Sequence, residues 1–138
     1  MAIVFDSISE GDALPSLTKP EITQLQLIKY AGASGDFNPI HTIPDKAREA
    51  GLEGTIVHGM LIMGILGQMV SGWAGVVNVV KFGVSFKAIT RPGDILSAKG
   101  TVKRKYEENG RKFLDCALYV EDANGEIKIE GKATVLAV

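Results

Sequence analysis

The spacing of the apolar residues divides the chain into a helical first half and a strand-rich second half, with the change after Gly72. Thr23 is suited to cap a helix, and Gln26 three positions later completes a capping-box pattern. The glycines between residues 32 and 35 are expected to end this helix. The apolar residues with helical spacing in this segment are Ile22, Leu25, Ile28 and Ala31.

Two more helices are predicted before the pattern changes. A short helix over residues 44–50 begins at Pro44 and is stopped by Gly51, the usual placement of these two residue types. Residues 58–71 are apolar on nearly every face, which is typical of a buried helix. Upstream of all three helices, residues 3–17 are expected to form an entry strand followed by a turn.

The second half of the chain has the pattern of an antiparallel sheet. Strands are predicted over residues 76–86, 95–106, 111–121 and 126–138. Turns are expected between them at residues 91–94, 107–110 and 123–125. Helices followed by a run of antiparallel strands indicate an α+β fold. We therefore expect one domain over residues 1–138, in which one long buried helix lies across an antiparallel sheet.

The composition is that of an ordinary globular protein and narrows the classes of partner. The chain is 46% hydrophobic and 22% charged, which argues against disorder, and its formal net charge of -1 lacks the cationic surplus that nucleic acid binding requires. Residues 1–6 lack the pattern of a secretion signal, and the apolar run over 56–70 is shorter than the roughly 20 residues of a membrane span. We expect a soluble cytoplasmic protein whose single cysteine, Cys116, is a small buried hydrophobe.

The polar loop after the first helix holds the first candidate for chemistry. Asp36 and His41 lie five positions apart, on either side of Asn38–Pro39. Proline fixes its own φ and keeps the preceding residue extended, so this loop is stiff. A carboxylate and an imidazole are the usual general acid–base pair near neutral pH, and Asn38 is suited to hold the loop through backbone hydrogen bonds. The spacing alone leaves open a purely structural Asx turn with His41 packed beside it.

The second candidate lies at His58–Gly59, where the long apolar helix begins. The first backbone N–H groups of a helix lack intrahelical partners, so they can stabilise an oxyanion that forms on a thioester or ester carbonyl. Gly59 lets a ligand approach the backbone closely. For His58 itself, the favoured interpretation is a satisfied buried imidazole.

Other kinds of site have weaker support. Asp36, His41 and His58 are the residues from which a metal site would be built, but the chain lacks the i, i+4 histidine spacing of helical zinc ligands, and we expect no metal. Neither a nucleophile elbow nor a dinucleotide fingerprint is present, and we expect no cofactor. We interpret the basic residues in or near the predicted strand connections mainly as solvated surface. The alternative is that they contact the phosphates of a CoA or carrier-protein arm. These residues are Arg91, Lys103, Arg104, Lys105, Arg111 and Lys112.

Both candidate segments resemble those of a known family, the MaoC-like dehydratases, which include the (R)-specific enoyl-CoA hydratases. Residues 30–41, with Ala47 beyond them, are similar to the hydratase-2 signature of that family, and residues 56–61 are similar to its second block. The resemblance covers nearly the whole chain and implies the hot-dog fold, an antiparallel sheet wrapped around a long central helix. Within the family, residues 60–64 and the following Trp73 are slightly more similar to the (3R)-hydroxyacyl-ACP dehydratase subunits of mycobacterial-type fatty acid elongation.

The resemblance implies reversible hydration of 2-enoyl thioesters to (3R)-3-hydroxyacyl thioesters, carried on CoA or on an acyl carrier protein (ACP). By this resemblance, Asp36 and His41 would hold the attacking water and transfer the proton. The Gly59 N–H would bind the thioester oxygen. The residues it places in substrate binding or loop support are Ser34, Asn38 and His58. It also implies a homodimer, or a heterodimer with a related subunit, with the active site near the interface.

Two positions depart from the family pattern. Ala33 replaces a larger aliphatic residue, and residues 42–44 lack the acidic residue that commonly follows the histidine. Neither departure removes a catalytic group, but both leave the shape of the acyl pocket open. Two other functions also stay open, because a fold does not fix an activity. One is an acyl thioesterase, and the other is a non-catalytic acyl-binding chain that completes the active site of another subunit.

Overall fold

The structure, a computed structural model, describes residues 2–138. The first half contains η1 (Phe5–Ser7), β1 (Leu17–Thr18), α1 (Gln24–Ser34), η2 (Pro39–His41), α2 (Pro44–Glu49) and α3 (Gly59–Ala74). The second half contains η3 (Val76–Asn78), β2 (Val79–Phe86), β3 (Ser97–Glu108), β4 (Arg111–Glu121) and β5 (Ile127–Ala137). The predicted helices and the four long strands are confirmed, with ends shifted by a few residues.

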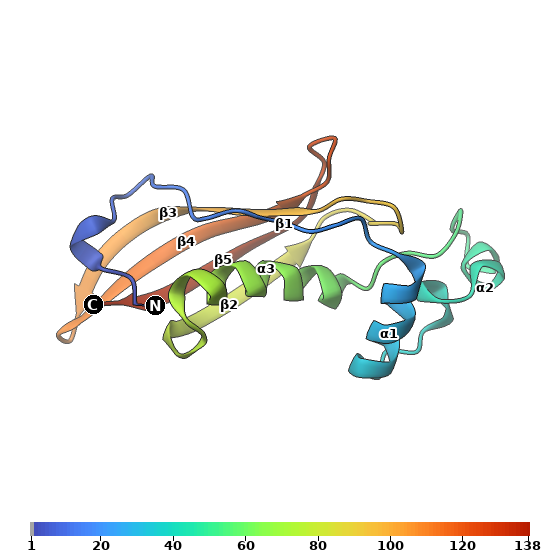
Figure 1. The fold of residues 1–138 in the computed structure, drawn as a ribbon, viewed down its shortest axis with the longest axis horizontal. Helices are drawn as coiled ribbons and strands as arrows, with labels where there is room; N and C mark the ends of the chain where they lie inside the picture. Colours follow the sequence, from blue (N-terminus) through green and yellow to red (C-terminus); the bar gives the residue numbers. More distant parts are fainter. Residues whose placement is uncertain (1) are drawn as a thin grey trace.

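The strands form one antiparallel sheet in the order β1-β3-β4-β5-β2. This sheet curls over α3, and α1 and α2 gather at the end of the molecule where α3 begins (Figure 1). The α+β prediction of an antiparallel sheet wrapped around a long helix is therefore confirmed. Within residues 2–138, no helix combines the length and the apolar character that crossing a membrane would require.

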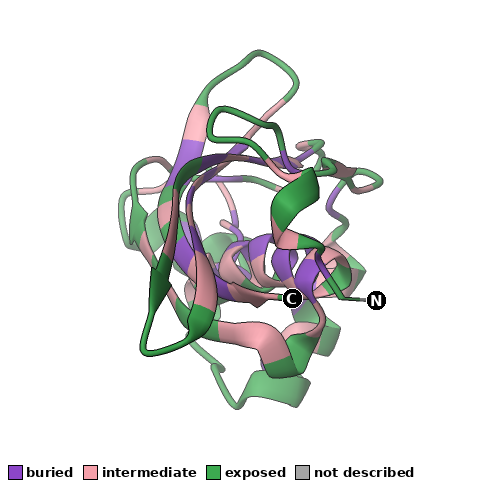
Figure 2. Cartoon of the chain, turned by 90° about the vertical axis from the view of Figure 1, so that its left-hand side faces the viewer, coloured by how far each residue is buried: buried purple, intermediate pink, exposed green. Residues whose placement is uncertain are grey.

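The core lies between the curled sheet and α3, where the buried residues gather (Figure 2). From Leu114 onward every second residue of β4 is buried, as expected for a strand with one face on the core. These residues are Leu114, Cys116, Leu118 and Val120, and the buried residues of α3 are Ile62, Ile65, Leu66, Met69, Val70 and Ala74. The expected burial of Cys116 is also confirmed, and burial raises the pKa of its thiol to about 12.

The hairpin between β3 and β4 depends on a two-residue turn. Asn109 and Gly110 both have positive φ, at 51° and 75°. Two-residue hairpin turns of this type need positive φ at both positions, and Asn-Gly is their preferred sequence. The turn therefore brings the long strands β3 and β4 into the register that pairs Glu108 with Arg111.

Two phenylalanines of β2 pack against two glycines of α3. A Cβ placed on Gly67 would lie 3.4 Å from Phe82 Cε1, and one on Gly59 would lie 2.8 Å from Phe86 Cε1. The spacings agree, because four residues of strand and eight residues of helix both span roughly 12–13 Å. The glycines therefore let the edge strand approach the helix closely, and the second pair lies where the helix begins.

Two sequence expectations are wrong. Residues 3–17 form the 3₁₀ helix η1, an isolated bridge between Ala13 and Thr101 and only the first residue of β1, because the backbone of this segment pairs with β3 at scattered positions. Residues 76–78 form the 3₁₀ helix η3, so the next strand begins only at Val79. The predicted buried helix is confirmed as α3, although Met60 near its start is 57% exposed.

The basic residues around position 104 lie inside β3, which agrees with the strand predicted over residues 95–106. Lys103 and Arg104 belong to β3, where a register shift between Val102 and Arg104 marks a bulge. The ammonium group of Lys105 donates hydrogen bonds to the carbonyls of Phe5 and Ile8. Lys105 therefore binds the N-terminal segment to β3, whereas Lys103 and Arg104 are exposed on the sheet.

Candidate active site

The polar loop begins where α1 ends and lies next to the start of α3. The Thr23 side chain accepts a hydrogen bond from the Gln26 N–H, which confirms the predicted N-cap. At the other end, Gly35 adopts a left-handed conformation with φ 76° and terminates the helix. Asp36 is therefore the first residue after a well-defined helix stop, and its backbone position is set by α1.

Short side-chain hydrogen bonds make the loop rigid. Ser34 Oγ accepts from the Asp36 N–H at 3.1 Å, and Asp36 Oδ1 accepts from the Asn38 N–H at 3.2 Å. Asn38 Oδ1 in turn accepts from the Ile40 N–H at 3.2 Å, so Asn38 caps η2. The Asx turn considered from the sequence is present, but it uses only one carboxylate oxygen of Asp36, and Oδ2 faces His41.

Three hydrogen bonds join the loop to the segment that precedes α3. The Ile56 N–H donates to the Ile40 carbonyl at 3.1 Å, and His41 Nδ1 lies 2.8 Å from the Ile56 carbonyl. His58 Nε2 lies 3.3 Å from the Asp36 carbonyl. The two segments singled out in the sequence are thus brought together.

The hydrogen bond to Ile56 sets the protonation of the His41 ring. A carbonyl oxygen can only accept, so Nδ1 must carry the hydrogen, and in the neutral ring Nε2 keeps its lone pair. This nitrogen lies 3.7 Å from Asp36 Oδ2, a separation wider than a direct hydrogen bond. His41 is 7% exposed, whereas half of the Asp36 side chain is accessible. The pair therefore offers one basic nitrogen and one carboxylate oxygen to the same small space.

His58 is fully buried behind this pair. Its ring stacks on His41 with centroids 3.8 Å apart and planes 23° apart, and Tyr30 packs edge-on against it at 4.8 Å. Burial first, and the neighbouring His41 second, lower the pKa of His58 below its usual 6.5, which favours the neutral ring. The predicted burial of this imidazole is confirmed, but the prediction that the ring is fully hydrogen-bonded is wrong. Its Nε2–H holds the Asp36 carbonyl, whereas its Nδ1 has no hydrogen-bond partner within residues 2–138.

The start of α3 exposes free backbone donors next to His58. Within the described part of the chain, the N–H groups of Gly59 and Met60 have no hydrogen-bond partner, whereas those of Leu61 and Ile62 donate to the His58 carbonyl. Such unpaired N–H groups carry the positive end of the helix dipole. Phe86, 54% exposed, packs its ring over the Gly59 backbone.

Three residues that support this arrangement were not predicted. Gln24 donates from Nε2 to the His41 carbonyl at 2.9 Å and accepts a hydrogen bond from the Thr55 hydroxyl. Gln24 therefore ties α1 to both halves of the site. Phe86 reaches the site from β2. None of them has a local sequence signal, because each acts only through residues far away in the chain.

The residues considered for a metal site do meet, but their geometry is unsuited to one ion. Asp36, His41 and His58 offer ligand atoms that lie within 4.8 Å of one another. The lone pairs of two stacked, nearly parallel imidazoles do not converge on a common point about 2.0–2.1 Å from each nitrogen, as zinc requires. Moreover, one nitrogen of each ring already faces a backbone carbonyl.

The arrangement is suited to acid–base chemistry on a substrate that develops negative charge on oxygen. One imidazole nitrogen and one carboxylate oxygen can exchange protons with a bound water. The free N–H groups at the start of α3 can stabilise an oxyanion close by. The single cysteine, Cys116, is buried in the core and so is not available here as a nucleophile.

Comparisons with known proteins bear on the family and the fold of the chain. A family model described as "MaoC like domain" matches residues 11–122. An "(R)-specific enoyl-CoA hydratase" of Rhodospirillum rubrum is 35% identical over 136 residues, which cover 96% of this chain and 90% of the relative. A "3-hydroxybutyryl-CoA dehydratase" of Methylorubrum extorquens is 31% identical over 137 residues, covering 96% of this chain and 83% of the relative. The R-hydratase PhaJ1 of Pseudomonas aeruginosa superposes with a TM-score of 0.86 at 22% identity, covering 99% of this chain and 86% of that one, and so has the same fold.

Proposed function

The chain belongs to the MaoC-like domain family, and from that premise we propose that it catalyses the reversible hydration of 2-enoyl thioesters to (3R)-3-hydroxyacyl thioesters. The observation that carries the proposal is the His41 ring, whose Nδ1 hydrogen bond leaves a basic Nε2 beside the Asp36 carboxylate. The chain is then a hydro-lyase that acts as one domain over residues 1–138.

In the proposed mechanism, Asp36 and His41 hold the attacking water together. At 3.7 Å, His41 Nε2 and Asp36 Oδ2 are close enough for one water oxygen to reach both and too far apart to satisfy each other. The water oxygen bonds to the β-carbon and gives up a proton to this pair, and the pair delivers a proton to the α-carbon. Dehydration is the same sequence in reverse.

Negative charge builds up on the thioester oxygen when the substrate passes through an enolate. We assign its stabilisation to the free N–H of Gly59 at the start of α3. His58 supports this step indirectly, because its ring holds the Asp36 carbonyl and stacks on His41 while its backbone leads directly into Gly59. Ser34 and Asn38 hold the loop through the hydrogen bonds described above.

The acyl group is proposed to arrive as a thioester of CoA or of an acyl carrier protein, and the chain to work as a homodimer. The relatives named above are described as acting on CoA thioesters, which supports the reaction type. A heterodimer with a related subunit is the alternative assembly.

The test is hydration of crotonyl-CoA by the purified chain, followed as the loss of enoyl-thioester absorbance. Asp36→Asn and His41→Ala are each expected to lower kcat/KM on the order of a hundredfold or more, because each removes one half of the acid–base pair. Asp45→Asn is the matched control, since that carboxylate is 88% exposed on α2 and pairs only with Arg48. Circular dichroism of all three variants checks that the fold is intact.

Two results would contradict the proposal. Wild-type activity that survives in both Asp36→Asn and His41→Ala would remove the mechanism. Release of free thiol from acyl-CoA without hydration would assign the chain to the thioesterases instead. A chain that is inactive alone but active after a second polypeptide is added would support the heteromeric form.

A further inference from the structure

The face of the sheet turned away from α3, called the outer face below, is built from three rows of residues in register across β2, β5, β4 and β3. The rows are Lys81–Thr134–Asp115–Arg104, Gly83–Lys132–Ala117–Thr101 and Ser85–Glu130–Tyr119–Lys99. Lys103 adds a further cation at the bulge of β3, and the pairs Lys87–Glu130 and Lys99–Glu121 lie at one end.

The three rows form a positively charged surface, although the net charge of the chain is -1. Together with the flanking pairs it contains six of the 15 basic residues but only three of the 16 acidic ones, a formal charge of +3 on a chain of net -1. Within residues 2–138, the cations without an ion pair on this face are Lys81, Lys103, Arg104 and Lys132. The charge is therefore available to an external partner.

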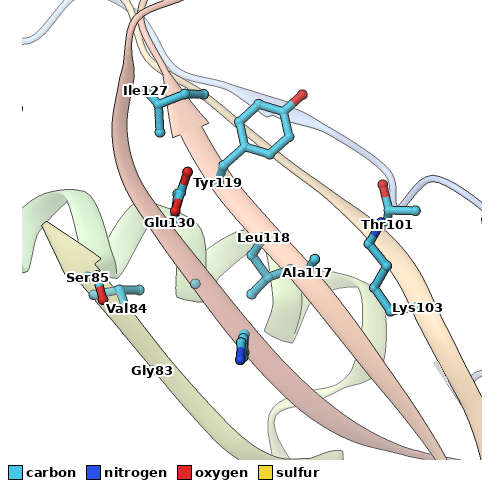
Figure 3. Close-up of a pocket in the computed structure, with 12 residues that line it drawn as sticks. Gly83, Val84, Ser85, Thr101, Lys103, Ala117, Leu118, Tyr119, Ile127 and Glu130 are labelled. Atoms are coloured by element: carbon cyan, nitrogen blue, oxygen red, sulfur yellow. The ribbon is translucent and has the colours of Figure 1, made fainter. Parts of the chain in front are cut away.

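The same face is hollowed where its residues are smallest. Two adjoining depressions of about 740 and 550 Å³ share Gly83, Lys103, Ala117 and Lys132 in their linings. Figure 3 shows Lys103 and Thr101 on one side of this trough and Val84 and Ser85 on the other, with Ala117 between them and α3 behind the sheet. A floor of glycine and alanine between long cationic side chains leaves room for side chains of another molecule.

The trough ends beside the candidate active site. Ser85 lies in its lining, and the next residue, Phe86, packs its ring over the backbone of Gly59. A partner on the outer face would therefore contact β2 next to the point where Phe86, on the opposite side of the same strand, forms the wall of the site. This proximity connects the charged face with delivery of the substrate.

We propose that the outer face docks an acidic protein that carries the acyl thioester substrate to this enzyme. The inference rests on the proposed function and decides between its two carriers. The cations are spread over three strand spacings, about 14 Å from Lys81 to Arg104, a pattern that matches several carboxylates on a protein surface better than a single phosphate. A second copy of this chain is a poor occupant, because two outer faces of charge +3 would repel each other.

The test compares one acyl group on three carriers: crotonyl-ACP, crotonyl-CoA and crotonyl-pantetheine, which lacks phosphate. The variant is Lys103→Glu with Lys132→Glu, two cations that line both depressions. We expect kcat/KM for crotonyl-ACP to fall on the order of tenfold or more through KM, because reversed charges repel an acidic partner. Hydration of crotonyl-pantetheine should stay at the wild-type rate. Added salt should reduce the difference between variant and wild type on crotonyl-ACP.

The matched control is Lys29→Glu with Arg91→Glu, which changes the total charge equally at two exposed positions away from the outer face and outside the trough. An unchanged rate with crotonyl-ACP in the trough variant, or an equal loss in the control, would overturn the proposal. A loss confined to crotonyl-CoA would also overturn it, in favour of a phosphate site.

Direct binding separates this proposal from the proposed function. Fluorescence anisotropy of labelled, unacylated ACP reports docking whether or not the chain hydrates any substrate. Binding by the wild type that is lost in the trough variant supports the docking face, even if crotonyl thioesters are not hydrated. Absence of binding by the wild type would overturn it, even if crotonyl-CoA is hydrated.

Discussion

Gly59 is the residue at which packing and proposed chemistry meet. Its N–H is free within the described chain, and its Cα hydrogens face the ring of Phe86. Any side chain here would compete with that ring, because a Cβ would lie 2.8 Å from Phe86 Cε1. A glycine is therefore required by the neighbouring strand as well as by access to the backbone.

Gly59→Ala is expected to lower kcat/KM on the order of tenfold to a hundredfold, because the Phe86 ring must move and small displacements at a reacting centre are costly. The control is Gly64→Ala on the same helix, where a Cβ meets nothing within 4 Å. That substitution should leave activity intact and stabilise the fold by about 0.5–1 kcal/mol. Steady-state kinetics and urea unfolding of both variants check the prediction, and equal kinetics for Gly59→Ala and wild type would contradict it.

His58 predicts a pH dependence of stability. Its folded pKa is lowered by burial and by His41, so below pH 6.5 the unfolded chain binds a proton that the folded chain resists. The free energy of unfolding should therefore fall as the pH drops through 6.5 toward the lowered folded pKa, by at most about 1.4 kcal/mol per pH unit.

His58→Gln removes this titration but keeps an N–H donor for the Asp36 carbonyl. Chemical denaturation of both proteins at pH 7.5, 6.5 and 5.5 should give a shallower decline for the variant. Identical slopes would show that His58 does not titrate differently in the folded state.

At the scale of elements, the site depends on connections between segments that are distant in the chain. Ile40 and Ile56 pair through backbone and histidine hydrogen bonds, and the Val57 N–H donates to the Thr90 carbonyl at 2.8 Å. The segment before α3 is thus held on one side by the polar loop and on the other by the connection from β2 to β3. This double attachment positions the start of α3.

The hairpin between β4 and β5 is stabilised by a buried cation. Lys128 is 3% exposed, and its ammonium group donates to the Ile89 carbonyl at 2.8 Å and to Glu126 at 2.5 Å. Asp122 Oδ2 lies 3.5 Å from it. Asp122 Oδ1 accepts from the N–H groups of Asn124 and Glu126, both at 2.9 Å. Lys128 therefore connects this hairpin to the segment that holds Val57.

Asp122→Asn is expected to lower the free energy of unfolding by about 1–2 kcal/mol at pH 7, since charge-assisted hydrogen bonds are lost. The N–H of Glu126 is the main reason that the pKa of Asp122 is lowered, with Asn124 and Lys128 contributing. This stabilisation is present above the unfolded pKa of about 3.9 and disappears as the pH falls through the lower folded pKa. Urea unfolding at pH 7, 5 and 3 should therefore show wild type and variant converging only at the lowest pH. A constant difference at all three would contradict the assignment, and Asp45→Asn serves as the exposed control.

At the scale of the whole molecule, β2 is an edge strand next to exposed apolar residues. Val77 is 86% exposed and Val80 is 46% exposed. Unpaired edge strands are available for pairing with a second chain, and exposed apolar surface favours it. The outer face lies on another side of the strand, so pairing of edges would leave that face open.

The proposed homodimer predicts a solution mass of twice 14.7 kDa by light scattering. Val77→Lys with Val80→Lys should shift the protein to the mass of one chain and lower its activity, because charges would be placed on the proposed contact. Leu25→Lys, at a similarly exposed apolar position on α1, should not change the mass. A wild-type mass of 14.7 kDa with full activity would contradict the homodimer.

Features that depend on neighbouring residues were predictable from the amino-acid order. The strand β4 follows its alternation over Arg111–Glu121, α1 begins at its Thr23 cap, and Asn38–Pro39 makes the polar loop stiff. The joint presence of the two motif segments also indicated the family that the comparisons show. Local sterics, helix caps and hydrophobic periodicity act within a few residues, so they can be predicted from the sequence.

Contacts between distant segments were decided by the tertiary structure. The ring of Phe86 over Gly59, the bridge made by Gln24 and the cationic trough that includes Lys103 all depend on how the sheet curves and in which register its strands pair. The segment over residues 3–17 was mispredicted for the same reason, because its backbone contacts with β3 and with Val138 override its local pattern. Residue order specifies which groups are present, and only the folded sheet determines which of them meet.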